Sequence, residues 1–342
     1  MKTNEFIPAV VPTTGELSTP EVITTSYPQV ITNSGNNPSF LEGPSSAISL
    51  KDLTEKSIVP HYRNLEPSIS HTAFIMTLME AARIVFGSVS EPEIRVSHEI
   101  RAKKASALKK AQKDLQPSDF TLYYERMCFL CTLPGITTNI GGQEMTLSIF
   151  GARTYQNSKF HTSKNKQGEA FSFGLGATVK ICSNQCITTS GTKIAVKCSD
   201  VNSLLKEALI LFSNFSVENN FRTFGTLQDY ELTESQFCSL LGRMRLLNAM
   251  SPVEQKKHPA ILMGDSQMNA VARLALQEDN PFRANPVDGS ISLWNFHNLL
   301  TESIKSSYID LALPRWANAT DLSVGLASAL DGRDQTYDWF LN

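Results

Sequence analysis

The chain has 342 residues, of which 41% are hydrophobic and 19% charged, so it can bury a substantial core in one large domain or two. Its formal net charge of -2 excludes attraction of the whole protein to nucleic acid or to an anionic membrane, and such binding would need a local basic patch. Prolines interrupt the apolar residues of the N-terminus and no run reaches the roughly 18 apolar residues of a membrane span, so we expect a cytoplasmic protein with reduced cysteines.

The N-terminal region, residues 1–45, is rich in Thr, Ser, Pro, Asn and Gly and has few large apolar side chains. Such a composition cannot bury enough surface to offset the entropy of ordering, so we predict a flexible tail. Order should begin near Leu50 with a short helix or a capped turn, which Pro60 limits. A second helix, which covers one face of a sheet, is predicted to open at Ser70 or His71 and to stop at Gly87, with His71 interpreted as a cap residue.

Alternation of apolar and polar residues with a period of two predicts about five strands, paired in a mostly antiparallel sheet. They are expected at residues 93–104, 121–133, 143–155, 171–181 and 192–198. A short helix is expected at 105–115, where alanines and leucines fall on one side, namely Ala105, Leu108, Ala111 and Leu115. The Asn and Gly residues of PGITTNIGG, 134–142, tolerate positive φ and therefore predict the hairpin link between the second and third strands.

The strand at 171–181 organises this part of the chain. Its apolar side chains share one face, as expected of a half-buried strand, and they are Phe171, Phe173, Leu175, Ala177, Val179 and Ile181. The following SNQC segment, 183–186, is interpreted as a turn that presents Asn184.

From Ser199 onward, apolar residues recur at helical spacing, and Thr233 and Gln236 have the spacing of a capping box. Strands followed by helices predict an α+β protein, with a mixed, mostly antiparallel sheet and covering helices, followed by a mainly helical C-terminal region. We expect the tail at 1–45, the sheet region at 46–200, and a helical region at 201–342 that packs on the sheet and could share one domain with it.

Two close cysteine pairs, Cys128/Cys131 and Cys182/Cys186, invite a zinc interpretation, because tetrahedral thiolate sites often use such pairs. Residues three apart in a strand point to opposite faces, however, so buried free thiols are the simpler interpretation. We therefore predict no metal site and no cofactor.

A nucleophilic Cys182 beside Asn184 is an alternative that leaves open whether the protein is an enzyme. Such a thiol needs a lowered pKa and a nearby base. The histidines that could act as the base are His98, His161 and His297. Because the sequence does not bring any of them to the thiol, no catalytic residue is assigned.

Basic residues form the most suggestive feature. Seven Lys or Arg residues fall between Arg95 and Lys113 with only Glu99 interrupting, and KFHTSKNK, 159–166, carries a second cluster. Such residues neutralise phosphates, and exposed tyrosines can stack on bases of a single strand; the candidate tyrosines are Tyr123, Tyr124 and Tyr155. The predicted nucleic-acid contacts are Arg95, Arg101, Lys103, Lys104, Lys159, Lys164, Lys166 and Asn184. The alternative is a solvated edge, since edge lysines also block aggregation.

Several segments together resemble a bacterial family of proteins of unknown function carried on plasmids and conjugative transposons, itself distantly similar to phage/plasmid-like proteins. The segments are PEIRVSHEI, TLYYERM, ICSNQC, LTESQF, LGRMR, LMGDSQ, ISLWNFHNLLT, KSSYIDLALPRWANA and the final WFLN. The resemblance covers most of residues 38–342. It implies a cytoplasmic protein of a mobile element but transfers no catalytic residue.

The leading hypothesis is thus a mobile-element-associated, nucleic-acid-binding protein without catalytic activity, with DNA or RNA as partner and no membrane association. One alternative is a cytoplasmic, hydrolase-like enzyme with a Cys182/Asn184 cleft. Another is a module that binds a host or element-encoded protein, such as an inhibitor of host defence, through its tail or exposed aromatic residues.

Overall fold

The computed structural model describes residues 23–24, 38–57, 69–107, 109–155 and 169–342. Most of the predicted tail lies outside these residues, as do Lys159, Lys164 and Lys166. No helix in the described ranges is long and apolar enough to span a bilayer.

The main sheet has the strand order β10-β8-β7-β6-β3-β2, and every pairing between its strands is antiparallel. Its strands are β2 (Ser46–Ile48), β3 (Glu93–Val96), β6 (Arg126–Ile140), β7 (Gln143–Thr154), β8 (Glu169–Val179) and β10 (Thr192–Cys198). Two short strands lie beside this path, with β1 (Ile23–Thr24) on β6 and β9 (Gln185–Cys186) on β8. Separate two-stranded sheets pair β4 (Glu99–Lys103) with β5 (Phe120–Tyr124), and β11 (Glu231–Leu232) with β12 (Ile291–Ser292).

The β6–β7 hairpin turns at Gly141 and Gly142, whose φ angles are 58° and 75°. Positive φ at both central residues is the geometry that matches the twist of paired strands, and glycine adopts it without steric cost. The predicted glycine turn is confirmed, but it is much shorter than residues 134–142. Most of that segment belongs to β6, with a register shift between Thr132 and Thr137.

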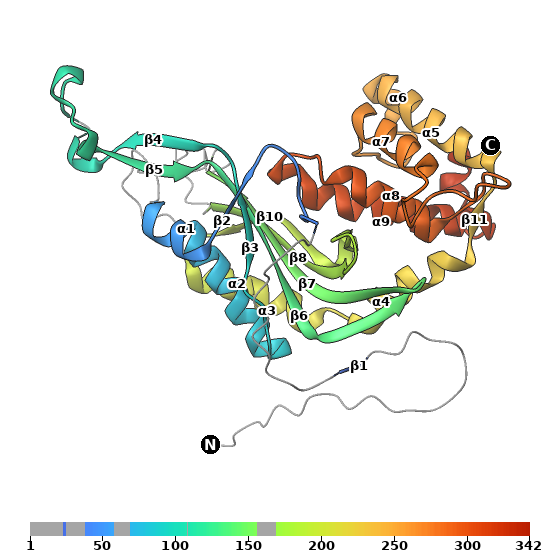
Figure 1. Cartoon of the computed structure of the whole chain (residues 1–342), viewed down its shortest axis with the longest axis horizontal. Helices are drawn as coiled ribbons and strands as arrows, with labels where there is room; N and C mark the ends of the chain where they lie inside the picture. Colours follow the sequence, from blue (N-terminus) through green and yellow to red (C-terminus); the bar gives the residue numbers. More distant parts are fainter. Residues whose placement is uncertain (1–22, 25–37, 58–68, 108, 156–168) are drawn as a thin grey trace.

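One face of the sheet packs against α2 (His71–Phe86) and α3 (Val201–Asn214) (Figure 1). The ring of Phe74 on α2 lies 5.7 Å from Phe129 on β6 and 5.0 Å from Phe171 on β8. Helix α2 begins where Ser70 Oγ accepts a hydrogen bond from the amide of Ala73, so Ser70 rather than His71 is the cap.

The other face packs against α9 (Ile309–Leu330), which follows α8 (Leu293–Ile304). Phe150 on β7 meets Trp316 on α9 edge to face, with ring centroids 4.9 Å apart. Because helices cover both faces, β8 is buried on both sides from Leu175 to Val179, and the prediction of a half-buried strand is wrong there. Ile181, predicted in the core, is 57% exposed because it lies in the turn beyond β8.

Of the remaining helices, α1 (Leu50–Lys56) lies in the sheet region and the others lie in the C-terminal region. The others are α4 (Val217–Thr226), α5 (Glu234–Ala249), α6 (Pro252–Gln255), α7 (Asp265–Leu276) and α10 (Asp338–Leu341). The predicted capping box at Thr233 and Gln236 is present at the start of α5. Buried side chains from both regions form one continuous hydrophobic cluster. The predicted α+β class, with a mainly helical C-terminal region, is confirmed.

Two predicted strands are each divided in two. The strand expected at 93–104 breaks between β3 and β4, and the one at 121–133 breaks at Glu125, between β5 and β6. The helix expected at 105–115 is wrong: 3-10 turns occupy Ala105–Ala107 and Gln112–Asp114, with a third at Pro117–Asp119. Ala107 is buried, but none of the described residues of this segment belongs to the hydrophobic cluster of the body, and short isolated helices are marginal in water. We call residues 99–124 the arm, because β4 and β5 project from the body of the molecule (Figure 1).

Candidate nucleic-acid interface

The arm leaves the body where β3 ends and β6 begins. Val96 and Met127 are the last ladder pair on the body side. Beyond them, the amide of Ser97 donates to the carbonyl of Arg126 at 2.9 Å, and the amide of Arg126 donates to Ser97 Oγ at 3.0 Å. These two hydrogen bonds extend the pairing of β3 with β6 into the neck of the arm, residues 97–98 and 125, and so join the arm to the core strands.

A buried polar cluster lies beneath this neck. The Arg153 guanidinium forms an ion pair with Glu169 and lies 4.3 Å from the centre of the Tyr155 ring. The His71 ring lies at a tilt against the same tyrosine ring, with the centroids 4.4 Å apart, and its Nε2 lies 2.8 Å from the carbonyl oxygen of Tyr124, to which it donates. Burial, together with the charge of Arg153, lowers the pKa of His71 to about 3. The imidazole is therefore neutral at physiological pH, and it ties helix α2 to the end of β5.

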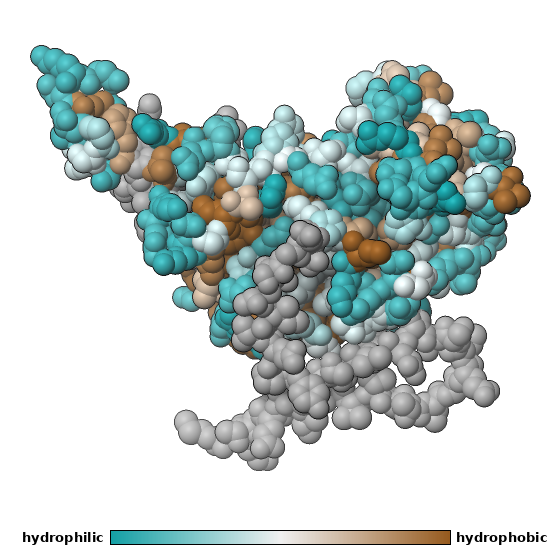
Figure 2. Space-filling view, viewed as in Figure 1, coloured by the Kyte–Doolittle hydropathy of each residue, from teal (hydrophilic) through white to brown (hydrophobic). Residues whose placement is uncertain are grey.

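The arm carries an excess of positive charge, with six basic and three acidic residues between Glu99 and Tyr124. Strand register places Arg101 opposite Leu122 and Lys103 opposite Phe120, so these four side chains share one face of the ribbon. Lysines at the far end are exposed: Lys104, Lys109 and Lys113. Lys110 is paired instead with Asp119, at 2.8 Å. Figure 2 shows the arm projecting with its tip largely hydrophilic.

Of the predicted contacts, the structure brings Arg101, Lys103 and Lys104 together on the arm. Arg95 is apart from them, half-buried on β3, where its guanidinium donates to the hydroxyl and the carbonyl of Ser45 at 3.2 and 3.3 Å. Lys159, Lys164 and Lys166 lie outside the described residues.

Asn184 does not fit a surface contact. It is fully buried, and its amide donates to the carbonyl and side-chain oxygens of Asn298 at 3.1 and 3.2 Å. The predicted turn is present at the β8–β9 hairpin, but it points inward because α8 covers it. The expectation of exposed tyrosines is also wrong for Tyr124 and Tyr155, which are 6% and 3% exposed, because both belong to the packed base of the arm.

Sequence reasoning missed a hollow on the arm. It has a volume of about 430 Å³ and is lined by Arg101, Leu115, Gln116, Pro117, Phe120 and Leu122. The signal available in the sequence was the presence of Leu115, Pro117 and Phe120 in an otherwise polar stretch. Their arrangement depends on the 3-10 turn at Pro117–Asp119, where Asp119 accepts a hydrogen bond from the amide of Gln116 at 2.8 Å.

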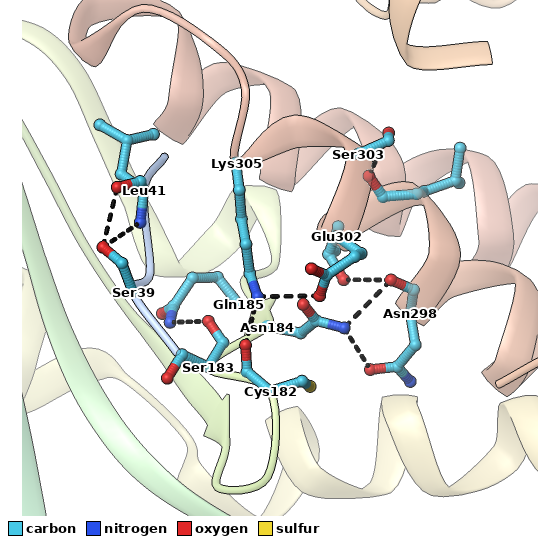
Figure 3. A network of polar contacts seen from close by, with 12 residues as sticks. Ser39, Leu41, Cys182, Ser183, Asn184, Gln185, Asn298, Glu302, Ser303 and Lys305 are labelled. Atoms are coloured by element: carbon cyan, nitrogen blue, oxygen red, sulfur yellow. Dashed lines mark hydrogen bonds and ion pairs between the residues drawn. The ribbon is translucent and has the colours of Figure 1, made fainter. Parts of the chain in front are cut away.

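The Cys182 turn lies in a different network, which joins the β8–β9 hairpin to the end of α8 (Figure 3). The side chain of Lys305, 1% exposed, donates to the carbonyl of Cys182 and to Glu302. Burial raises the pKa of the Cys182 thiol to about 11. A thiol of this pKa is almost entirely protonated at neutral pH, which disfavours a nucleophilic role.

The other paired cysteines are also buried, and burial raises the pKa of Cys128 and of Cys186 well above the ordinary range. All six cysteines are free thiols. Within the described ranges, no three His, Cys, Asp or Glu side chains are placed to hold a metal ion together.

Comparison with curated proteins and with solved structures found no match. A protein-family model does match, over residues 21–341. The match begins inside the predicted tail, earlier than the resemblance found in the sequence, and it continues almost to the C-terminus. The chain therefore belongs to the family described as "Domain of unknown function, B. Theta Gene description (DUF3871)".

Proposed function

We propose that this protein binds nucleic acid, DNA or RNA, through the basic face and tip of the arm, without a catalytic step. The observation that carries the proposal is a projecting two-stranded ribbon with excess positive charge on a chain whose net charge is -2. A two-stranded ribbon fits the major groove of a duplex, and Lys and Arg on it would replace counterions at phosphates. The proposed phosphate contacts are Arg101, Lys103, Lys104, Lys109 and Lys113.

The setting is part of the same proposal. Six free thiols support a reducing compartment, which is the cytoplasm in most cells. Association with a mobile element rests on the resemblance of the sequence motifs to a plasmid and conjugative-transposon family.

The test is the anisotropy of labelled oligonucleotides, single-stranded DNA, duplex DNA and single-stranded RNA, titrated with protein from about 50 to 300 mM salt. A triple variant, Lys104→Gln, Lys109→Gln and Lys113→Gln, should weaken binding and reduce the slope of log K against log salt by about 2 to 3. Absence of binding to all three oligonucleotides at the lowest salt would overturn the proposal.

A matched control removes the same charge elsewhere. Lys206, Lys256 and Lys257 are exposed and away from the arm, so their replacement by Gln changes the net charge equally without touching the arm. This control should leave the salt slope at its wild-type value. Equal weakening in both triple variants would mean that binding follows net charge and not the arm.

A second candidate is protein binding, because the helical region exposes large apolar side chains. Val287, Leu276 and Val253 are 91%, 82% and 73% exposed. Capture of a partner from nuclease-treated lysate, weakened by Val253→Asp, would favour this function over the first.

A further inference from the structure

The hollow on the arm differs from the basic surface around it. Among the described residues that line it, Leu115, Pro117, Phe120 and Leu122 are apolar, and Arg101 and Gln116 are polar. It lies on the ribbon face that carries Arg101, Lys103 and their cross-strand partners. Figure 2 shows hydrophobic residues, in brown, among the hydrophilic ones on the arm.

These apolar side chains do not serve the core. Leu115, Phe120 and Leu122 are only partly buried, and Pro117 is exposed. None of the four belongs to the hydrophobic cluster that unites the body. Apolar surface concentrated in a concave site with a few polar groups is typical of ligand pockets, so the hollow has the character of a ligand site.

The lining is suited to a flat, apolar group attached to an anion. Phe120, Leu122 and Pro117 offer surfaces against which a ring can pack. The guanidinium of Arg101 has no ion pair within the described part of the chain, and Gln116 has a side-chain amide that can both donate and accept. Lys103, which is paired with Phe120, lies on the same ribbon face, and its charge attracts a polyanion. A nucleotide combines these properties, since its base stacks on apolar or aromatic side chains while its phosphate pairs with Arg or Lys.

We propose that the hollow receives one unpaired nucleobase of the strand bound by the arm, with Arg101 on an adjoining phosphate and Gln116 at the edge of the base. This inference rests on the proposed nucleic-acid binding. A base within an intact duplex has both faces covered and must be unstacked before it can enter such a pocket, and the cost is lowest for a base that is already unpaired. The arm should therefore prefer single strands and bulged duplexes over perfect duplexes.

The experiment compares three duplexes of one sequence: perfect, with a single-nucleotide bulge, and with the same bulge made abasic. Wild-type protein should bind the bulged duplex about tenfold more tightly than the perfect one, because only the bulge offers a base that can stack in the hollow. The abasic bulge, which keeps the backbone kink but lacks the ring, should lose this preference. Placing 2-aminopurine in the bulge gives a second readout, because its fluorescence reports whether the base is stacked.

Two variants locate the effect on the hollow. Phe120→Ala removes one wall and should abolish the preference for the bulge while leaving affinity for the perfect duplex unchanged. Pro117→Ser is a milder change in case Phe120→Ala disturbs the arm. Equal wild-type affinity for the bulged and abasic duplexes would overturn the inference and leave the proposed function standing, whereas absence of binding to every duplex at low salt would remove both.

Discussion

The Nζ atom of Lys110 lies 2.8 Å from Oδ1 of Asp119, across the tip of the arm. The other carboxylate oxygen of Asp119 accepts the amide of Gln116 at 2.8 Å. That hydrogen bond, and then Lys110, hold the pKa of Asp119 below its ordinary value. The stability that this carboxylate contributes to the tip of the arm is therefore fully present above its unfolded-state pKa, near 4. It is lost as the pH falls through the lower folded-state pKa.

We predict that Asp119→Asn releases Lys110 for phosphate binding while retaining an oxygen to accept the Gln116 amide. Nucleic-acid binding should then tighten, with a salt slope steeper by about one. Asp114→Asn is the matched control, because it removes the same charge from an exposed position with no ion pair among the described residues. If anisotropy titrations gave both variants the same slope of log K against log salt, the ion pair with Asp119 would not keep Lys110 from binding phosphate.

A second prediction concerns the stability of the protein against pH. Burial, with a contribution from Arg153, lowers the pKa of His71 to about 3, and burial lowers the pKa of His297 to about 4. Both rings are neutral in the folded protein but take up a proton on unfolding below about pH 6.5. The free energy of unfolding should therefore decrease as the pH is lowered below this value. Each histidine contributes a slope of up to about 1.4 kcal/mol per pH unit.

Urea denaturation between pH 7.5 and 5 measures this dependence. His71→Gln, which keeps a side-chain donor for the carbonyl of Tyr124, should be less stable at pH 7.5 and should have a flatter pH profile. A variant that loses stability equally at every pH would show that proton uptake by His71 does not drive the slope.

Asn184→Ala is predicted to affect stability and not binding. The change removes the donor to Asn298 inside a fully buried site, and loss of such buried hydrogen bonds costs about 1–3 kcal/mol. Denaturation should reveal this loss, while the affinity of the folded variant for every oligonucleotide stays at the wild-type value. A lower affinity for the oligonucleotides without a lower stability would indicate that Asn184 contributes to nucleic-acid binding.

Cysteine reactivity tests the enzymatic alternative. Burial raises the pKa of Cys182 to about 11, whereas Cys238 is exposed. Iodoacetamide at about pH 8 should alkylate Cys238 first and Cys182 far more slowly, because the thiolate is the reacting form. Peptide mass spectrometry after timed quenching gives the order, and rapid labelling of Cys182 would restore the case for a nucleophile there.

Close packing of the sheet against α2 gives a further prediction. A Cβ atom added at Gly151 would lie 2.3 Å from a ring carbon of Phe129 and 3.0 Å from Phe74. Gly151→Ala should therefore destabilise the protein by about 1–3 kcal/mol. Gly242→Ala is the control, since nothing lies within 4 Å of its added Cβ in α5, and it should stabilise by up to about 1 kcal/mol. Equal denaturation midpoints for the two variants would contradict this packing.

The sequence predicts those parts of the fold that depend on local patterns. Alternation located β7, β8 and β10, and the hydroxyl at Thr233 located the start of α5. It does not reveal the arm, because the breaks at residues 97–98 and at Glu125 contain neither Gly nor Pro, the usual punctuation of a turn. Burial of both faces of β8 also escapes prediction, since α9 arrives from a distant part of the chain.

The candidate site was predicted only in part, because its local charge is visible in the sequence and its long-range contacts are not. Charge density along the sequence identified Arg101, Lys103 and Lys104, which share the arm. Arg95 was assigned to the same surface because it is close to the arm in sequence, and Asn184 because it is a polar residue in a turn. The structure places both away from the arm. The hollow could not be foreseen, since it joins β4 to residues beyond a tip that the sequence suggested was helical.

Val96 and Met127 face each other across the β3–β6 ladder, directly before the neck. The arm is thus an insertion between β3 and β6, which already pair with each other on the body side. A short turn would suffice to connect these two strands. Excision of residues 100–123, which keeps the buried Tyr124 and its contact with His71, should leave a body that folds, and transplantation of the same stretch onto the end of an unrelated hairpin should carry its ligand preference along. Such portability would make the arm a unit that can be exchanged independently of the body that bears it.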